Sequence, residues 1–349
     1  MLLIDDQIPL LNELFSTVDT VRSFDGRSLT RDDLIRYRAT GVFVRSTTRC
    51  DRALLEGTRV SFVGTATSGT DHIDDEALAA MGINVIDAHG SNANAVAEYV
   101  ITAILFDGID CANATVGIVG YGAVGTLVAH YLERLGARIQ IYDPLRLAYD
   151  GSIQDRHVDF EELLRTSDII TFHPNLHAGE VHPSLHMLHA ATAALIRDEA
   201  LVINTSRGEV FTADAVEHLL KRADGRLVLD VWPNEPVPDP SIVEQCLIAT
   251  PHIAGYTINA KEQGAMDVAV AYIQKHGLAM TLLDRVVRHA DADVTIDWDA
   301  DALAELLLDR RPIDLDAEAF VKAYLAAPTA ATFDAARKNY PLRAETLHG

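Results

Sequence analysis

The chain has 349 residues, 48% of them hydrophobic and 23% charged, which is typical of a soluble globular protein with about two or three domains. It has no apolar run of the roughly 18 residues that a membrane-spanning helix needs, and no basic segment ahead of a long apolar one at the N-terminus, so we expect neither a membrane protein nor a secreted one. The net charge of −22 disfavours nucleic acid and anionic membranes as partners, and three scattered cysteines favour a reducing, cytoplasmic compartment.

Residues 1–92 alternate short apolar runs with helical patterns, which predicts an α/β unit with a parallel sheet. The expected strands are Leu2–Ile4, Gly41–Val44, Val60–Val63 and Ile83–Ile86, and the expected helices include Arg31–Arg38 and Asp74–Met81. The apolar-rich segment Ala93–Phe106 is predicted to be a helix that connects this unit to the next one.

A G-x-G-x-x-G motif, with glycines at Gly120, Gly122 and Gly125, directly follows an apolar β-type run and leads into a helical pattern. A second apolar run then ends in Asp143, near the ~20-residue spacing expected for a ribose-binding acid. This setting predicts a dinucleotide site, because the glycines let the backbone approach a pyrophosphate at a helix N-terminus. A carboxylate at Asp143 repels a 2′-phosphate, which favours NAD over NADP. The alternative is a glycine-rich turn in another doubly wound protein.

The rest of the chain continues the alternation and then changes in composition. The expected strands are Thr115–Val119, Arg138–Tyr142, Ile169–Phe172, Leu201–Asn204, Leu227–Asp230 and Leu247–Ala249, and the expected helices include Phe160–Arg165, Ala190–Ile196, Thr212–Arg222 and Ala260–Lys275. From about residue 284 the chain is rich in Asp, Ala and Leu. We therefore expect a substrate-binding domain (1–92 and 256–283), a dinucleotide-binding domain (93–255) and a small C-terminal domain (284–349).

Three polar residues, Arg207, Glu235 and His252, follow the carboxyl ends of predicted strands in the dinucleotide domain. Ligands of open parallel sheets bind beyond these strand ends. Oxidation of a 2-hydroxy acid needs a base for the hydroxyl proton, and a histidine titrates near working pH. A neighbouring carboxylate would orient that histidine, and an arginine would hold the substrate carboxylate.

Several segments carry a resemblance to the D-2-hydroxyacid dehydrogenase family. They are Gly120–Gly125, Asn204–Gly208, Asp230–Pro236 and Thr250–Gly255. The resemblance implies a Rossmann-type doubly wound parallel sheet domain, a flavodoxin-like substrate domain and a small C-terminal α+β domain that forms a homodimer. It also implies that His252 is the acid/base, Glu235 its partner and Arg207 the substrate anchor.

Further segments resemble the members of this family that oxidise a phosphorylated four-carbon 2-hydroxy acid in vitamin B6 synthesis. They are Val44–Ser46, Phe62–His72, Asp143-Pro144, His252–Thr257 and Phe333–Tyr340. The resemblance implies substrate contacts from Ser46, Thr67 and Tyr256, and Arg45 is added as an anion contact because of its charge. The implied NAD contacts are Gly120, Gly122, Ala123, Val124, Gly125, Asp143, Thr205, Asp230 and Gly255. It further implies a 2-oxo acid as a second substrate that reoxidises the cofactor.

Other features leave alternatives open. Pro174 stands where the family often has a threonine, and it removes a backbone N–H, which puts one cofactor contact in doubt. Five histidines crowd residues 173–189, but their spacing fits no zinc pattern, so we expect no metal. Another D-2-hydroxyacid dehydrogenase, acting on glycerate, lactate or 3-phosphoglycerate, is one alternative function. An NAD-sensing binding protein on the same fold is the other.

Overall fold

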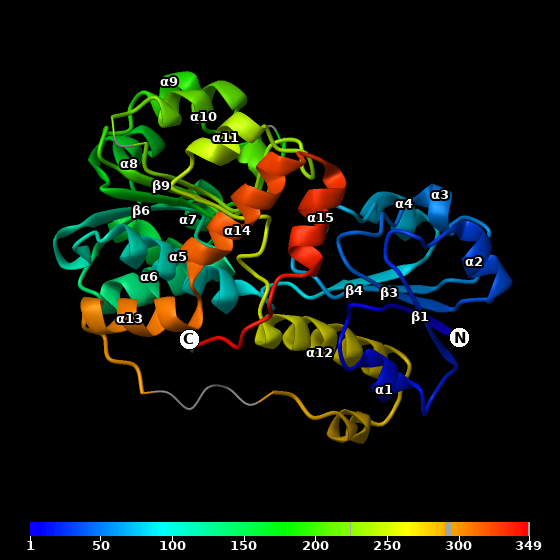
Figure 1. The fold of residues 1–349 in the computed structure, drawn as a ribbon. Coiled ribbons are helices and arrows are strands. Elements are labelled where there is room, and N and C mark those ends of the chain that lie inside the picture. The colour runs from blue at the N-terminus through cyan, green and yellow to red at the C-terminus, as the bar shows by residue number, and fades with distance from the viewer. Residues whose placement is uncertain (180, 224, 290–294, 348–349) are drawn as a thin grey trace. The chain divides into compact units, whose positions relative to one another are not determined.

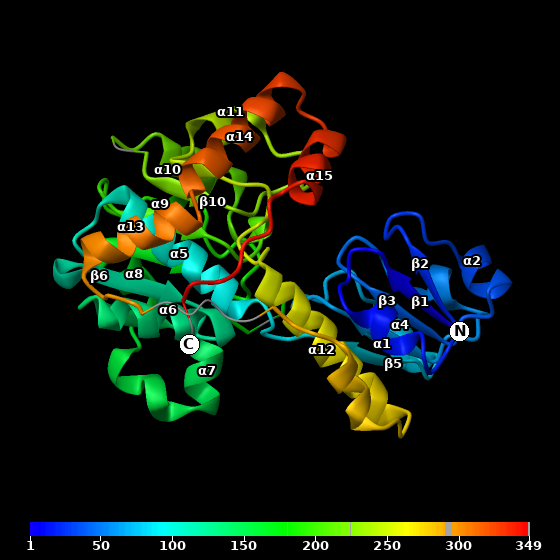
Figure 2. The same cartoon turned by 60° about the horizontal axis from the view of Figure 1, so that its bottom comes forward.

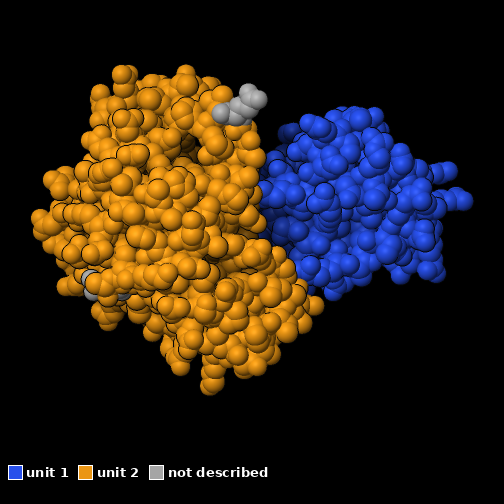
Figure 3. Space-filling model, turned by 90° about the horizontal axis from the view of Figure 1, so that it is seen from above, with its two compact units in different colours: residues 1–92, 256–291 blue, residues 93–255, 292–349 orange. Residues whose placement is uncertain are grey.

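The computed structural model describes residues 1–179, 181–223, 225–289 and 295–347. The chain divides into two compact units, which Figure 3 colours separately. Unit 1 comprises Met1–Asn92 and Tyr256–Asp291, and unit 2 comprises Ala93–Gly255 and Ala292–Gly349. Within the described residues, no helix combines the length and the apolar character that crossing a membrane requires.

Unit 1 is built on a five-stranded parallel sheet in the order β2-β1-β3-β4-β5 (Figure 1). The strands are β1 (Leu2–Asp5), β2 (Val21–Phe24), β3 (Gly41–Val44), β4 (Phe62–Thr65) and β5 (Asn84–Asp87). This order is that of flavodoxin-like sheets, which confirms the expected class. Among these five strands, only β2 was not predicted from the sequence. β2 is an edge strand that pairs with β1 alone, and its sequence, Val-Arg-Ser-Phe, contains no apolar run.

Helices cover both faces of the unit 1 sheet. They are α1 (Leu11–Phe15), α2 (Arg31–Arg36), α3 (Arg52–Leu55), α4 (Asp75–Ala80) and α12 (Ile258–Lys275), with a 3-10 turn η4 (Met280–Arg285). Successive residues of a strand point to opposite faces, so Leu2 packs in the cluster with Tyr272 of α12 whereas Leu3 packs with Leu34 and Leu78 of α2 and α4. Side chains of Thr30, Asp51, Asp74 and Thr257 cap the N-termini of α2, α3, α4 and α12.

Unit 2 contains a six-stranded parallel sheet in the order β11-β10-β9-β8-β6-β7. The strands are β6 (Thr115–Val119), β7 (Arg138–Tyr142), β8 (Ile169–Phe172), β9 (Leu201–Asn204), β10 (Leu227–Leu229) and β11 (Ile248–Ala249). The chain continues from β6 to β7 on one side, and β8 lies on the other side of β6. The carboxyl end of β6 is therefore the topological switch point, where open α/β sheets bind ligands. The glycine-rich turn lies directly after this strand.

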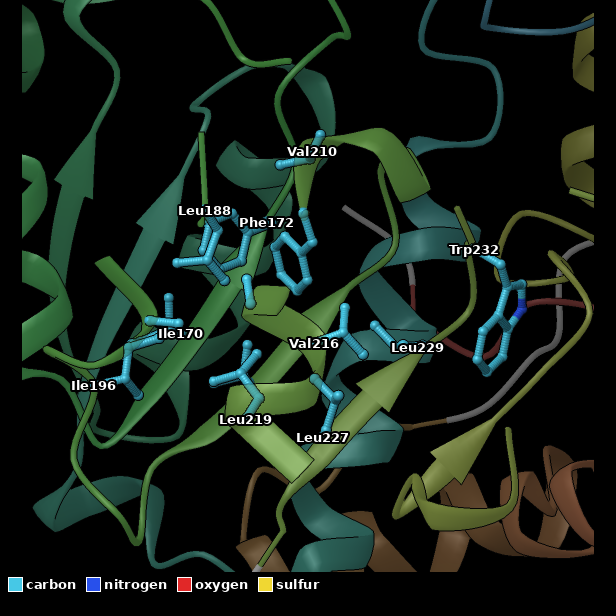
Figure 4. Packing of buried hydrophobic residues seen from close by; sticks show 14 of the residues in the cluster. Ile170, Phe172, Leu188, Ile196, Val210, Val216, Leu219, Leu227, Leu229 and Trp232 are labelled. Carbon is cyan, nitrogen blue, oxygen red and sulfur yellow. The ribbon is translucent and has the colours of Figure 1, made fainter. Parts of the chain in front are cut away.

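Helices of unit 2 pack on this sheet and bury its apolar side chains. They are α5 (Ala93–Asp107), α6 (Ala123–Arg134), α7 (Pro144–Tyr149), α8 (Phe160–Thr166), α9 (Ala190–Ala193), α10 (Ala213–Leu220) and α11 (Pro240–Gln245), with 3-10 turns η1 (Cys111–Asn113), η2 (Gly151–Arg156) and η3 (Gly208–Val210). Figure 4 shows the core between the sheet and α10, where Phe172, Val216, Leu219 and Leu229 gather. Both parallel sheets match the predicted doubly wound class.

The C-terminal segment differs from the expected α+β domain. The described part, residues 295–347, contains α13 (Ala300–Arg310), α14 (Ile313–Ala326) and α15 (Ala330–Lys338) and no strand. Helix α14 packs against α5, α11 and β11 (Figures 1 and 2). Its Phe320 and Tyr324 belong to the hydrophobic core that holds Trp232. This segment has little β-branched sequence and many strong helix formers, which explains its helical structure. It shares a hydrophobic core with the dinucleotide domain.

Candidate active site

The glycine-rich turn after β6 combines two tightly packed glycines with an open one. Gly120 has φ +87°, and a Cβ there would lie 2.7 Å from the backbone nitrogen of Pro174. A Cβ on Gly125 would lie 2.2 Å from the carbonyl oxygen of Gly120. A Cβ on Gly122 would meet no atom within 4 Å. Gly120 and Gly125 are therefore required by the turn itself, whereas Gly122 leaves open space at the N-terminus of α6.

That N-terminus suits an anionic group. Gly122 is the N-cap residue of α6, and no side chain caps the helix there. The first N–H groups of a helix have no partner within the helix and carry a partial positive charge. Open space in front of them is what the backbone approach of a dinucleotide pyrophosphate requires. The residues present therefore fit the predicted cofactor, with Ala123 and Val124 at the helix start.

Asp143 links this turn to the end of β7. Its Oδ2 accepts a hydrogen bond from the Tyr121 N–H at 2.7 Å, and its Oδ1 accepts one from the Arg146 N–H at 2.8 Å, which caps α7. A carboxylate oxygen has more than one acceptor site, so both oxygens can also accept from a ribose hydroxyl. Asp143 is half-buried beside the glycine turn.

His173 lies next to the same turn, and its role was missed by the sequence analysis. Its Nε2 lies 2.9 Å from Thr171 Oγ1 and its Nδ1 lies 3.3 Å from Thr205 Oγ1. Burial holds the pKa of His173 well below its usual range, so the ring is neutral. Its position directly after the predicted strand Ile169–Phe172 was the feature of the sequence that could have indicated a place at the ligand-binding edge of the sheet. His173 thus orients Thr205, one of the predicted cofactor residues.

The three predicted catalytic residues follow β9, β10 and β11, which are neighbours in the sheet. His252 Nδ1 lies 2.8 Å from Glu235 Oε2, and Glu235 Oε1 accepts the Trp232 N–H at 2.9 Å. The turn that carries Arg207 touches the same region, since a Cβ on Gly208 would lie 2.0 Å from the carbonyl carbon of Trp232. Parallel strands end at one edge of a sheet, which is why these distant sequence segments meet.

The charge on Glu235 is stabilised by its neighbours. Burial by itself would raise the pKa of Glu235, but His252 and the positive charge of Arg337 outweigh it and hold the pKa below its usual value. Glu235 is therefore an ionised acceptor at neutral pH. An ionised Glu235 places the proton of neutral His252 on Nδ1 and leaves Nε2 as the basic nitrogen.

Asp230 holds the backbone of the turn that carries His252. Its Oδ1 accepts the Ile253 N–H at 2.7 Å and the Thr250 hydroxyl at 2.6 Å, and its Oδ2 accepts the Ala254 N–H at 2.9 Å. Only 1% of Asp230 is exposed. The family resemblance implies only an NAD contact for Asp230, and its hold on the backbone after His252 was not predicted from the sequence. The NAD contacts of Asp230 and of half-buried Gly255 remain predictions.

Arg207 lies in a turn that a neighbouring amide stabilises. Asn204 Oδ1 accepts the Ser206 N–H at 3.0 Å, and Asn204 Nδ2 donates to the Arg207 carbonyl at 2.9 Å. The guanidinium of Arg207 donates to the Ser206 carbonyl at 2.8 Å. Arg207 as a whole is half-buried.

The predicted substrate residues Arg45 and Ser46 follow β3 in unit 1. Arg45 Nε donates to Asp5 Oδ1 at 2.9 Å, and Asp5 is completely buried. Asp5 therefore neutralises part of the charge that was expected to attract an anion. Ser46 is exposed beside it.

Thr67 and Tyr256 also belong to unit 1. The Thr67 hydroxyl lies 2.8 Å from that of Thr65, which in turn lies 2.9 Å from His72 Nε2. Thr67 is half-buried, and its hydroxyl is oriented further by donating to the Gly69 carbonyl at 3.2 Å. Lys261 Nζ lies 4.6 Å from the centre of the Tyr256 ring. This lysine adds a positive charge next to a predicted substrate residue, and it was not among the residues predicted from the sequence.

No group of three histidine, cysteine or carboxylate side chains that could hold a metal occurs among residues 1–179, 181–223, 225–289 and 295–347. The three cysteines are free thiols.

Comparison with known proteins places this arrangement in a family. Residues 95–254 match the model of the D-isomer specific 2-hydroxyacid dehydrogenase NAD-binding domain. The erythronate-4-phosphate dehydrogenase of Pseudomonas entomophila is 37% identical over 358 residues, which cover 99% of this chain and 92% of that protein. That of Azotobacter vinelandii is 37% identical over 357 residues, with the same coverage. The chain belongs to the D-isomer specific 2-hydroxyacid dehydrogenase family. It is thus an NAD-dependent oxidoreductase.

Solved structures of family members share the fold. D-lactate dehydrogenase from Aquifex aeolicus, complexed with NAD and lactic acid, aligns with a TM-score of 0.64 and 21% identity over 82% of this chain and 97% of that one. The 3-phosphoglycerate dehydrogenase of Entamoeba histolytica, with NAD+ bound, aligns with a TM-score of 0.65 and 24% identity over 79% of this chain and 96% of that one. These similarities support the two-sheet α/β architecture.

Proposed function

We propose that this family member oxidises 4-phospho-D-erythronate at its C2 hydroxyl to 2-oxo-3-hydroxy-4-phosphobutanoate, a reaction of pyridoxal 5′-phosphate synthesis. The full-length similarity to erythronate-4-phosphate dehydrogenases supports this substrate. The observation that carries the mechanism is the hydrogen bond between His252 Nδ1 and Glu235 Oε2.

In this proposal His252 is the acid/base. Its Nε2 takes the proton from the C2 hydroxyl, because Nδ1 is engaged by Glu235. Glu235 fixes the ring orientation and stabilises the imidazolium that forms. Arg207 binds the substrate carboxylate through its guanidinium and keeps C2 beside the histidine.

NAD, when bound, supplies the acceptor for the hydride that leaves C2. The turn around Gly122 and the start of α6 would hold its pyrophosphate, and Asp143 would accept hydrogen bonds from the ribose. Thr205, Asp230 and Gly255 complete the proposed cofactor contacts. The carboxylate of Asp143 disfavours a 2′-phosphate by repulsion.

Unit 1 would contribute the remaining substrate contacts. Ser46 and Thr67 present hydroxyls, and Tyr256 offers a phenol beside Lys261. Arg45 is the proposed phosphate contact, although its pairing with Asp5 weakens the attraction. We therefore expect hydroxyl donors to contribute more to phosphate recognition than Arg45 does.

We further propose a cytoplasmic homodimer in which the C-terminal segment takes part in the interface. A 2-oxo acid would serve as the second substrate that reoxidises the cofactor. Three free thiols agree with a reducing compartment.

The decisive assay follows NADH formation at 340 nm with NAD and 4-phospho-D-erythronate alone, with D-glycerate, D-lactate and D-3-phosphoglycerate as comparison substrates. Addition of 2-oxoglutarate afterwards should lower the absorbance, because the 2-oxo acid reoxidises the cofactor. We expect selective turnover of the four-carbon phosphate. Turnover of another acid instead would be consistent with the proposed base and would overturn the proposed substrate. Absence of turnover with every acid by protein that binds NAD would overturn the proposed activity and favour a sensor.

A further inference from the structure

Arg311 lies between α13 and α14 and has an unusual environment for an arginine. It is only 3% exposed. Its guanidinium donates to the carbonyls of Ala95 at 2.9 Å, Ile253 at 3.2 Å and Ala254 at 2.8 Å. Burial of an arginine lowers the stability of a fold unless its N–H donors find acceptors. The three carbonyls are the acceptors that allow Arg311 to be buried here.

Two of these three acceptors belong to the turn that carries the proposed base. Ile253 and Ala254 follow His252 directly, and their N–H groups are bound by Asp230. Arg311 therefore binds the carbonyls of the same two residues whose N–H groups bind the carboxylate. The backbone after His252 is held by one anionic and one cationic side chain, both buried.

The same C-terminal segment contacts the turn that carries Glu235. The Tyr324 hydroxyl of α14 donates to the Pro238 carbonyl at 2.8 Å. The ring centroids of Phe320 and Trp232 are 6.3 Å apart. The backbone N–H of Trp232 donates to the Glu235 carboxylate. Arg337 of α15 adds the positive charge that favours ionised Glu235.

We infer that the C-terminal helical segment positions the acid/base pair, with Arg311 holding the His252 turn and Tyr324 holding the Glu235 turn. This inference rests on the proposed role of the pair. It assigns the segment a role inside the same subunit, separate from any role in a dimer. Arg311 and Tyr324 are positioning residues, because they act through backbone that carries reacting groups.

The physical reason is the small tolerance of proton transfer to geometry. His252 must hold both Glu235 and the substrate hydroxyl at hydrogen-bond distance, and a shift of about 1 Å in a catalytic group can lower a rate roughly 100-fold. β11 has only two residues, so the sheet ladder restrains the turn after it weakly. The side chains of Asp230 and Arg311 supply that restraint.

The first test compares Arg311→Met with Arg222→Met in the full-length protein. Arg222 is the matched control, because it is 7% exposed and donates to the carbonyls of Arg197 and Ala200, before the amino end of β9, and of Leu219 in α10. We expect both variants to lower the melting temperature. Only Arg311→Met is expected to lower kcat, by roughly 10- to 100-fold with a small change in substrate KM, and Arg311→Lys should recover part of it. Equal kcat values in the two methionine variants would overturn the inference.

A second readout needs no substrate, so it separates this inference from the proposed function. Protein with ¹³C-labelled histidine rings is compared by NMR, with the His252 signal assigned from His252→Asn. We expect the His252 ring signal to shift or broaden in Arg311→Met and to stay in place in Arg222→Met. An unchanged signal in both variants would overturn the inference even if the wild-type protein oxidises no acid.

Tyr324→Phe covers the case in which Arg311→Met does not fold. It removes one hydroxyl and keeps the ring that packs in the core. We expect kcat to fall by about threefold to tenfold and the His252 ring signal to change, since the Glu235 turn loses one restraint. A Tyr324→Phe protein with wild-type kcat and an unchanged signal would contradict the inference.

Discussion

His252 and Asn234 have positive φ angles of 59° and 64°. Non-glycine residues in this left-handed region are uncommon and concentrate at functional sites, where the surrounding structure compensates their cost. Here Asp230 accepts hydrogen bonds from the two backbone N–H groups that follow His252. The backbone N–H of Trp232 donates to the carboxylate of Glu235, the residue after Asn234. The backbone conformation of both turns therefore helps to orient the side chains of His252 and Glu235.

Replacement of His252 by Asn tests the base without disturbing this backbone, because Asn tolerates the left-handed region. We expect kcat for the 2-hydroxy acid to fall by about 10²- to 10⁴-fold, the usual contribution of a general base. NAD affinity, measured by titration of protein fluorescence, should stay within about threefold of the wild type. Retention of wild-type kcat would show that another group takes the proton.

The Glu235 carboxyl predicts a pH dependence of stability. Its pKa in the folded protein lies below the ordinary 4.5, so an unfolded chain takes up the proton first as the pH falls. The stability that ionised Glu235 contributes is complete above pH 4.5 and is lost as the pH falls through the lower folded pKa. Urea unfolding at a series of pH values measures the free energy of unfolding. The difference in this free energy between wild type and Glu235→Gln should therefore become smaller as the pH falls.

Glu217→Gln is the control for this measurement. Glu217 forms an exposed ion pair with Lys221 on α10, where solvent screens the interaction. Its effect on unfolding should be small at every pH. A difference between wild type and Glu235→Gln that stays constant with pH would contradict the prediction.

At the scale of elements, the turn between β6 and α6 contains some glycines that the fold requires and another that leaves room for the cofactor. Gly120 and Gly125 face backbone atoms that a Cβ would meet at 2.7 Å and 2.2 Å, whereas Gly122 faces open space. Substitutions in the same turn should therefore have different consequences. Those at Gly120 and Gly125 act on the fold, and those at Gly122 act on the cofactor.

Gly122→Glu tests this separation against Gly120→Ala. We expect Gly122→Glu to keep the melting temperature of the protein without NAD, since its φ of −83° suits any L-residue. Its carboxylate should weaken NAD binding at least about tenfold by repelling the pyrophosphate. Gly120→Ala should lower the melting temperature itself, because φ is +87° and the Cβ clashes. Equal melting temperatures of the two variants would refute this assignment.

At the scale of the whole molecule, the net charge of −22 opposes the binding of anions. Arg207 and the N-terminus of α6 attract them locally, and Asp5 neutralises part of Arg45. Salt screens long-range repulsion more strongly than contacts at a partly buried site, since the Debye length falls from about 30 Å at 0.01 M to about 8 Å at 0.15 M.

We therefore expect kcat/KM for the phosphorylated substrate to rise as sodium chloride increases over this range. D-glycerate carries less negative charge, so its kcat/KM should rise less. A fall for the phosphorylated substrate would mean that local cations dominate the approach of the anion.

Much of this molecule could be predicted because its signals are local in sequence. The turn at Gly120–Gly125 follows its strand directly, and the class of both sheets follows from alternating apolar runs and helices. Edge strand β2 was missed because a half-exposed strand of four residues needs no apolar run. The α+β expectation for the C-terminal segment was wrong because it came from the family resemblance, whereas the segment has few β-branched residues and many strong helix formers. That α14 packs against α5, α11 and β11 could not be read from a local pattern.

The sequence by itself determined the dinucleotide turn, the strands of the unit 2 sheet and the identity of the residues that follow β9, β10 and β11. Only the tertiary structure decided that Glu235 and His252 share a hydrogen bond, that Arg45 is paired with Asp5, and that Arg311 reaches the backbone after His252. The physical reason is that such contacts join residues far apart in the chain, and their partners are often backbone carbonyls and N–H groups that every residue has.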